Sequence, residues 1–452
     1  MVERNSVYIL DISGMNHDGQ GVGRIDNFTV FVDGAVPGEK VEVRLTTVKK
    51  TYAVGELARI ISASPKRVSP ACAAFPKCGG CSLQHMSYDA QLEFKTGLVK
   101  DSIKRIGKLD DVIIHDTIGM ENTLYYRNKA QYPVGLCETG QEVLGFYAKY
   151  SHRIVECESC LIQDETSGKV RSILKDFIRE NKVSVYNETT GTGLLRHLMT
   201  RTGFKTGEVM VVLVINGKDL PHKQKLIDTL VAEVPQIKSI MLNINQKTTN
   251  IILGEKNIKL FGKDHITDYI GKHKFFISPL SFFQVNPVQT EVLYNKAIEY
   301  AGLSGKETVF DLYCGIGTIS LFLSERAKMV YGVEVVEDAI SDAKKNAELN
   351  GIYNIDFMVG EAEKVVPQIY KMGVKADVVV VDPPRKGCDE KLLETLVSMQ
   401  PERIVYVSCK PSTLARDLSY LSERGYKAIE VQPVDMFPHT AHVETVTVLY
   451  RR

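Results

Sequence analysis

Hydrophobic and polar residues alternate along the first sixty positions of the chain. Runs of this kind span residues 7–12, 28–34, 41–48 and 52–61, and turns containing glycine or proline separate them. A period of two places alternate side chains on opposite faces of a strand, so each run predicts a half-buried strand. Short strands joined by tight turns are typical of a small antiparallel barrel.

A helical period replaces this alternation further along the chain. In residues 87–106, apolar side chains recur at helical spacing behind Ser87, which predicts a helix. Between residues 123 and 270, strand-like runs and helical stretches mix irregularly, as in an α+β domain. The expected strands are 130–135, 143–148, 209–215, 239–245 and 250–254, and the expected helices are 164–180 and 221–233.

From about residue 275, short β-branched runs alternate regularly with helical segments. The expected strands are 308–313, 329–335, 378–382 and 404–408, and the expected helices are 290–302, 318–326, 337–350, 390–399 and 412–424. Strands that lack polar alternation are buried on both faces, as in a parallel sheet covered by helices. The pattern predicts a doubly wound α/β domain, and two further strand-like pieces follow it at the end of the chain.

Composition and charge exclude several classes of protein. The chain has 452 residues, of which 44% are hydrophobic and 25% charged, so it is an ordinary globular protein with room for about three domains. Lys and Arg number 56 against 55 Asp and Glu, which excludes a strongly cationic nucleic-acid-coating protein but allows a local basic groove. Without a leader or a long apolar run, we expect a cytoplasmic protein, with a monomer as the default.

The cysteines are clustered. Cys72, Cys78 and Cys81 lie close together in the sequence, and Cys157 and Cys160 form a second group. An odd total of nine in a chain without a secretory leader argues against a disulfide framework and favours a metal site. Spacing alone allows either zinc or an iron–sulfur cluster, because both can use four thiolates.

The segment 311–318, DLYCGIGT, joins the first strand of the α/β domain to a helix. Gly315 and Gly317 allow a sharp turn and a close approach to a ligand. Ser320 stands where a dinucleotide fingerprint has its third glycine. Glu334 ends the next strand, seventeen residues after Gly317, where an acid can accept hydrogen bonds from a ribose diol.

Asp382 ends a later strand and is expected to project into the same cleft. An acidic Asp311, together with the missing third glycine and the missing P-loop lysine, favours S-adenosylmethionine (SAM) over NAD or ATP, because the SAM sulfonium is cationic. Another nucleotide that binds a Rossmann-like fold is the alternative.

Cys409 and Glu444 are the candidate reactive groups. Cys409 follows a buried strand, and Glu444 lies in the terminal strand pair. Uracil C5 needs a thiolate added at C6 before it can attack a methyl donor, and a base must then remove the C5 proton. We expect Lys410 and the helix beginning near Ser412 to lower the pKa of the thiol. The alternative for Cys409 is a buried small hydrophobic residue, and the alternative for Glu444 is a solvated residue on a strand.

Five ordered motifs resemble the RNA (uracil-5-)-methyltransferase family. They occupy residues 281–287, 311–318, 382–387, 405–418 and 435–446, and the segment GQGVGR near residue 20 resembles a TRAM domain, a small RNA-binding barrel. The resemblance implies a class I SAM methyltransferase in which Cys409 is the nucleophile and Glu444 the base. It also implies that the SAM-binding residues are Gln284, Tyr313, Glu334 and Asp382.

The resemblance also implies a [4Fe-4S] cluster. Its ligands would be Cys72, Cys78, Cys81 and Cys160, with Cys157 as a bystander or an alternative ligand. The expected organisation is a TRAM barrel over 1–62, a central α+β domain over 63–92 and 123–270, and a Rossmann-like catalytic domain over 93–122 and 271–452.

The branch of this family that acts on 23S rRNA carries both a barrel and a cysteine cluster, so the resemblance implies a uridine in 23S rRNA, reached in a loop or by base flipping. Transfer RNA is the alternative substrate. Phe282 and Phe283 are candidates for base stacking, although one of them could be a core residue. Basic residues in 125–129, in 194–201 and at Arg385 are candidates for phosphate contacts.

Three other functions were weighed. RNA cytosine-5 methyltransferases place a cysteine beside the proline that follows Asp382, whereas Pro383, Pro384 and Arg385 follow it here. Exocyclic-amine methyltransferases carry an aromatic residue at the position of Arg385. A non-catalytic RNA-binding or iron–sulfur scaffold would leave Cys409 and Glu444 without a role.

Overall fold

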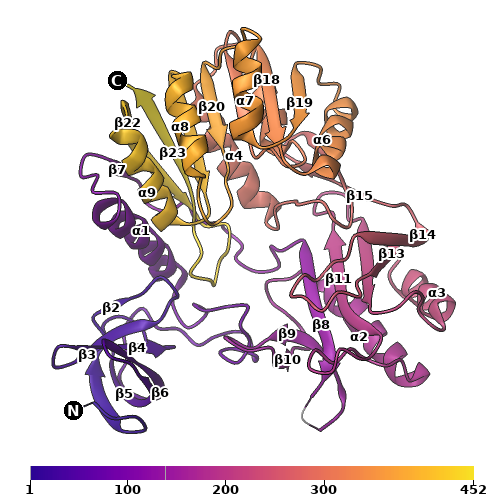
Figure 1. The fold of residues 1–452 in the computed structure, drawn as a ribbon. Coiled ribbons are helices and arrows are strands. Elements are labelled where there is room, and N and C mark those ends of the chain that lie inside the picture. The colour runs from indigo at the N-terminus through magenta and orange to yellow at the C-terminus, as the bar shows by residue number, and fades with distance from the viewer. Residues whose placement is uncertain (1, 138) are drawn as a thin grey trace.

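The computed structural model describes residues 2–137 and 139–452, which form three parts (Figure 1). The N-terminal barrel and the central domain lie side by side at the bottom of the view, and the catalytic domain lies above them. None of the helices in the described residues is long and apolar enough to cross a membrane.

The N-terminal part is a barrel-like sheet with the strand order β1-β5-β6-β4-β3-β2. Its strands are β1 (Val7–Asp11), β2 (Gly14–Met15), β3 (Gly21–Ile25), β4 (Phe28–Asp33), β5 (Lys40–Val48) and β6 (Tyr52–Ser62). Alternate side chains such as Val41, Val43 and Leu45 fill its interior. The pairing is antiparallel as predicted except between β4 and β6, which run parallel.

The central domain is a mixed sheet with the strand order β10-β9-β8-β11-β12-β13-β14, with helices packed on it. Its elements are β8 (Lys129–Leu136), β9 (Glu142–Tyr147), β10 (Ile154–Glu156), α2 (Glu165–Asn181), β11 (Leu195–Thr202), β12 (Val209–Ile215), α3 (Lys223–Glu233), β13 (Ile237–Ile244) and β14 (Lys256–Gly262). The α+β architecture agrees with the sequence pattern.

One predicted strand of this domain is wrong, and another strand was missed. Residues 250–254 form a loop, because the side-chain amides of Asn245 and Asn243 donate to the carbonyls of Ile251 and Gly254. The edge strand is instead β14, whose lysines obscure the alternation. The segment 194–201 was considered only for RNA binding, but most of it forms the central strand β11.

The catalytic domain holds a large sheet with the strand order β19-β18-β17-β20-β21-β23-β22-β7. Its strands are β7 (Ile113–Ile114), β17 (Thr308–Leu312), β18 (Met329–Glu334), β19 (Ile355–Val359), β20 (Val378–Val381), β21 (Arg403–Ser408), β22 (Tyr426–Val434) and β23 (Glu444–Arg451). The strands from β19 to β21 are parallel, and β23 runs antiparallel to both of its neighbours. The strand order reverses between β17 and β20, which is where open α/β sheets bind ligands.

Helices cover both faces of this sheet. They are α1 (Tyr88–Arg105), α4 (Pro287–Ala301), α5 (Thr318–Ser324), α6 (Glu337–Leu349), α7 (Ala362–Lys371), α8 (Glu390–Met399) and α9 (Pro411–Ser422). The sequence did not predict α7 or β19. The hairpin of β15 (Ile266–Ile270) and β16 (His273–Ile277) packs against α4 and α6, and it crosses the domain boundary expected between residues 270 and 271.

A buried ion pair joins α1 to the loop before Glu444. The Nζ of Lys95 lies 2.5 Å from the Oδ1 of Asp435, and both side chains are fully buried. Lys95 also donates to the Phe437 carbonyl (3.1 Å), and the Tyr88 hydroxyl donates to Asp435 Oδ2 (3.0 Å). This network fixes the loop that connects β22 to β23.

We predict that Lys95→Met lowers the free energy of unfolding by about 3–5 kcal/mol, because it leaves the Asp435 carboxylate buried without a counter-ion. The matched control is Lys66→Met, which removes an exposed pair with Glu93 and should cost less than about 1 kcal/mol. The measurement is the shift of the urea unfolding transition. Equal shifts in the two variants would contradict the assigned importance of the buried pair.

Candidate active site

A cleft of about 1,610 Å³ opens at the carboxyl ends of the parallel strands. Its lining includes all six side chains that were expected to act on cofactor or substrate: Gln284, Tyr313, Glu334, Asp382, Cys409 and Glu444. The volume exceeds the roughly 300–1,000 Å³ of a usual small-molecule site, so the cleft has room for a nucleoside cofactor and a target nucleotide together. Their individual roles stay predictions.

The turn between β17 and α5 forms the floor of the cleft. Tyr313 has a φ of 68° and Gly317 a φ of 81°, both in the left-handed region. A Cβ on Gly317 would lie 2.8 Å from the Phe357 ring, so this position requires glycine. The Glu334 carboxylate accepts from the backbone N–H groups of Gly315 (3.2 Å) and Val335 (2.8 Å), which fixes its position.

Asp311, expected from its charge to favour a cationic cofactor, does not line the cleft. Its side chain is fully buried beneath the turn, and its Oδ2 accepts a hydrogen bond from the Ser320 hydroxyl. Burial raises the pKa of Asp311 to about 7, with Asp382 and Glu334 adding to the effect. Ser320 therefore has a structural role at the position where a dinucleotide fingerprint has glycine.

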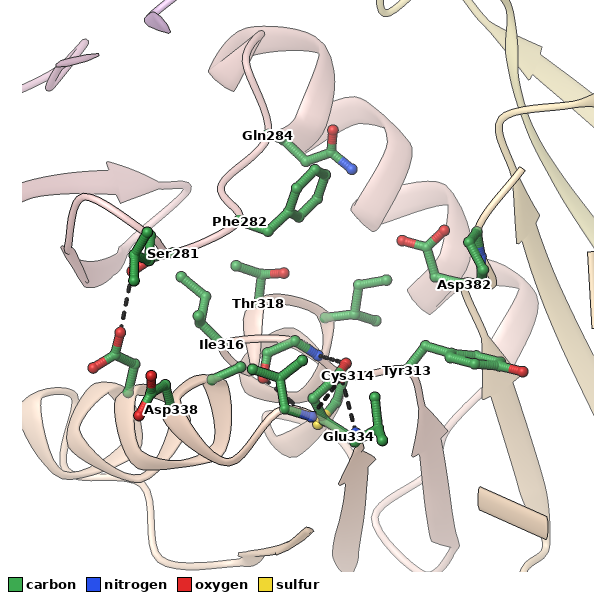
Figure 2. Close-up of a pocket in the computed structure, with 18 of the residues that line it drawn as sticks. Ser281, Phe282, Gln284, Tyr313, Cys314, Ile316, Thr318, Glu334, Asp338 and Asp382 are labelled. Atoms are coloured by element: carbon green, nitrogen blue, oxygen red, sulfur yellow. Dashed lines mark hydrogen bonds between the residues drawn. The ribbon is translucent and has the colours of Figure 1, made fainter. Parts of the chain in front are cut away.

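The segment before α4 forms the opposite side of the cleft. Figure 2 shows Phe282 and Gln284 on one side and Thr318 and Glu334 on the other. Phe282 is 68% exposed and lines the cleft, whereas Phe283 is 2% exposed and packs in the core. Of the two stacking candidates, only Phe282 is therefore available to a base.

Cys409 lies between the end of β21 and the start of α9. Its thiol has a pKa raised to about 11, first by burial and then by the carboxylates of Glu444 and Asp382, while Arg385 opposes the shift. The expected lowering of this pKa by Lys410 and the helix N-terminus is wrong. The reason is that burial and two nearby carboxylates outweigh both.

Glu444 begins β23 and is 5% exposed. Burial, assisted by Asp382, raises the pKa of Glu444 to about 8, so its carboxyl group holds a proton at neutral pH. Burial raises the pKa of Asp382 to about 6. An acid whose pKa lies near the operating pH is suited to exchange a proton with a substrate.

The cysteine segments enclose a second cavity of about 380 Å³, lined by Cys72, Cys78, Cys81, Cys157 and Cys160. Burial raises the pKa of Cys81 to about 12, and Cys160, Cys78 and Cys72 add to this effect, so the four groups are close together. Thiols in such a site become thiolates only when a bound cation compensates their charge.

Within the described residues, no three His, Cys, Asp or Glu side chains converge closely enough to hold a single metal ion. The Cys157 thiol donates to the Ser159 carbonyl (2.9 Å).

The basic candidates divide into two groups. Arg196 and Arg201 are buried and donate to backbone carbonyls, so their roles are structural. Arg127, Lys129 and Arg385 line the cysteine cavity, and Arg385 also lines the active-site cleft. The sequence alone could not separate these groups, because in both of them the arginines have similar neighbours along the chain.

A doubly wound sheet with a glycine turn after β17 and an acid at the end of β18 defines a class I SAM-dependent methyltransferase. The model of the tRNA (uracil-5-)-methyltransferase family matches residues 206–452, more than half of the chain, and the TRAM domain model matches residues 2–58. The chain belongs to this family of SAM-dependent RNA methyltransferases and carries an N-terminal TRAM domain.

Relatives and a solved structure resemble the chain over nearly its full length. Proteins named as RNA methyltransferases from Clostridium tetani and Clostridium acetobutylicum are 56% and 52% identical, over 99% and 100% of this chain and 97% and 98% of theirs. The crystal structure of the Pyrococcus abyssi tRNA (uracil-54, C5)-methyltransferase with S-adenosyl-L-homocysteine is 31% identical and has a TM-score of 0.75. The match covers 97% of this chain and 99% of the Pyrococcus abyssi chain.

We predict that Glu444→Gln speeds alkylation of Cys409 by iodoacetamide at pH 8. The Glu444 carboxylate raises the pKa of the Cys409 thiol, so removing its charge lowers that pKa and increases the thiolate fraction. In the wild type, the rate should rise about tenfold per pH unit between about pH 9, where Glu444 is ionised, and the thiol pKa of about 11. Peptide mass spectrometry follows the modification site by site.

Alkylation of Cys137 is the internal control, because this thiol lies outside the cleft and its rate should be equal in both proteins. An unchanged or slower rate at Cys409 in the variant would refute the electrostatic coupling to Glu444.

Proposed function

We propose that the protein transfers a methyl group from SAM to C5 of a uridine in 23S rRNA. The observation that carries this proposal is the presence of Cys409, Glu444 and Asp382 together in one cleft at the switch point of the sheet. The carboxylates of this cleft suit the hydroxyls of a ribose and a cationic sulfonium. Gln284, Tyr313, Glu334 and Asp382 would hold the cofactor, which supplies the methyl group as an electrophile.

Cys409 acts as the nucleophile and Glu444 as the base in this proposal. The Cys409 thiolate adds to C6 of the uracil, and the electron pair of the C5–C6 double bond moves toward the O4 carbonyl, which makes C5 nucleophilic. After C5 has received its methyl group, Glu444 removes the C5 proton in its ionised form, which a pKa of about 8 keeps accessible near neutral pH. The C5–C6 double bond re-forms, the C6–sulfur bond breaks and the thiolate leaves.

A second candidate substrate is transfer RNA. The Pyrococcus abyssi enzyme acts on uracil 54 of tRNA, and its likeness to this chain extends over the barrel as well as the catalytic domain. A barrel therefore does not by itself assign a family member to ribosomal RNA. The clustered cysteines still favour 23S rRNA, because the resemblance described above associates them with the branch of the family that acts on this RNA.

The cysteine cavity is proposed to hold a [4Fe-4S] cluster with Cys72, Cys78, Cys81 and Cys160 as ligands. Methyl transfer involves no net oxidation or reduction, so a structural or RNA-orienting role suits the site. Ser82, next to Cys81, accepts from the Ala441 backbone N–H (3.1 Å), and the Ser82 N–H donates to the His439 carbonyl (2.9 Å). The cysteine segment therefore supports the loop that leads to Glu444.

The first test is methyl transfer from labelled SAM to 23S rRNA and to tRNA in parallel, with Cys409→Ala as the control. We expect labelled 5-methyluridine in 23S rRNA and a loss of at least about 10³-fold in the control, because the nucleophile is absent. Nucleoside analysis is the readout. Label in tRNA would select the second candidate, and 5-methylcytidine or no label in either RNA would refute the reaction.

The cluster has its own test in Cys72→Ser/Cys78→Ser. We expect this protein to lose iron and to bind RNA more weakly. At saturating RNA it should still form the covalent adduct with 5-fluorouridine RNA, because Cys409 does not line the cysteine cavity. Iron analysis, RNA titration and denaturing electrophoresis are the measurements. A variant that folds and binds RNA normally but forms no adduct would contradict a structural role.

A further inference from the structure

The active-site cleft and the cysteine cavity meet at a shared wall. Arg385, Phe437 and His442 line both spaces. Arg385 lowers the pKa of both the Cys409 thiol and the Glu444 carboxyl, so its guanidinium lies near the reacting groups. A nucleotide whose base enters the cleft therefore has this wall beside its sugar and phosphates.

Positive charge accumulates at this junction without acidic partners. Within residues 2–137 and 139–452, neither Arg127, Lys129 nor Arg385 forms an ion pair, whereas the buried Lys95 is paired with Asp435. The pKa of Lys129 is lowered to about 8 by burial and by the charges of Arg201 and Arg127. Unpaired and mutually repelling cations favour the binding of an anion.

The pKa shift of Lys129 comes from burial and from the charges of Arg201 and Arg127, with no contribution from a thiol. Burial and then the charges of Arg385, Lys95 and Arg127 lower the pKa of His442 to about 4. The imidazole is therefore neutral and can donate a hydrogen bond without adding charge.

We propose that Arg127, Lys129 and Arg385 bind the phosphodiester groups of the RNA strand that flank the target nucleotide, at the junction of the two cavities. This site rests on the proposed action on RNA. Guanidinium groups bind phosphate oxygens in a bidentate manner, and contacts of this kind fix the register of the strand without reading its sequence. The ring pair of the half-buried Phe437 and the exposed His442, with centroids 6.2 Å apart, lies on the same wall and offers a surface for the adjoining sugar or base.

The test compares Arg127→Gln, Lys129→Gln and Arg385→Gln with the wild type in binding a single-stranded RNA that carries one 5-fluorouridine. Each lost phosphate contact should reduce the slope of log K against log salt by about 0.7. Lys225→Gln is the matched control, because Lys225 pairs with Glu180 in an exposed position on the central domain. Its slope should equal that of the wild type, and unchanged slopes in all three test variants would overturn the proposal.

A neutral methylphosphonate linkage locates the contact. Placed next to the 5-fluorouridine, it should weaken wild-type binding and have a smaller effect on Arg385→Gln, since the same contact cannot be lost twice. Equal weakening in both proteins would overturn the assignment. If a glutamine variant fails to fold, Arg127→Lys and Lys129→Arg keep the charge, and they should retain the salt slope.

Two further outcomes distinguish the phosphate site from the cysteine site and from the proposed reaction. Loss of iron from the glutamine variants with an unchanged salt slope would assign the cations to the cysteine site and overturn the phosphate site. A wild-type protein that shows the predicted salt slopes but forms no 5-methyluridine in any RNA would refute the proposed reaction while leaving the phosphate site supported.

Discussion

The buried pair of Lys95 and Asp435 is the interaction on which the geometry of the active site depends. Two charges that are wholly removed from water stay ionised only if each compensates the other, and the desolvation cost makes their separation unfavourable. Asp435 also accepts from the Phe437 backbone N–H (3.1 Å), so the pair fixes the backbone that leads to Glu444. A helix encoded near residue 95 thus positions Glu444, which is encoded near the end of the chain.

The same loop is the place where the three parts of the molecule meet. Val36 of the barrel, Leu83 of the cysteine segment, Ala90 of α1 and Ala441 of the loop share one small core. Gly19 of the barrel has a φ of 80°, and a Cβ there would lie 3.0 Å from Leu83 and 3.5 Å from Ala441. The barrel and the cysteine segment therefore contribute to the position of the catalytic loop as well as to the outer surface.

Local patterns predicted the parts of the structure that local forces determine. The parallel strands and the turn at 311–318 could be predicted because burial on both faces and the need for glycine leave direct marks in the sequence. The loop at 250–254 could not, because side-chain hydrogen bonds from Asn243 and Asn245, just before it in the chain, hold its carbonyls, and hydrophobic periodicity does not record such bonds.

The six cleft residues were identified from motifs. Their electrostatics were not predictable from sequence neighbours, because the thiol of Cys409 responds to Glu444 and Asp382, which only the fold brings near it.

That electrostatic environment connects cofactor binding to reactivity. Burial and the carboxylates of Asp382 and Glu444 hold the pKa of the Cys409 thiol at about 11, so almost all of it is protonated at neutral pH. A cation that enters the cleft offsets those carboxylates and favours the thiolate. The acids that raise the pKa of the Cys409 thiol therefore make its thiolate fraction sensitive to any positive charge bound beside them.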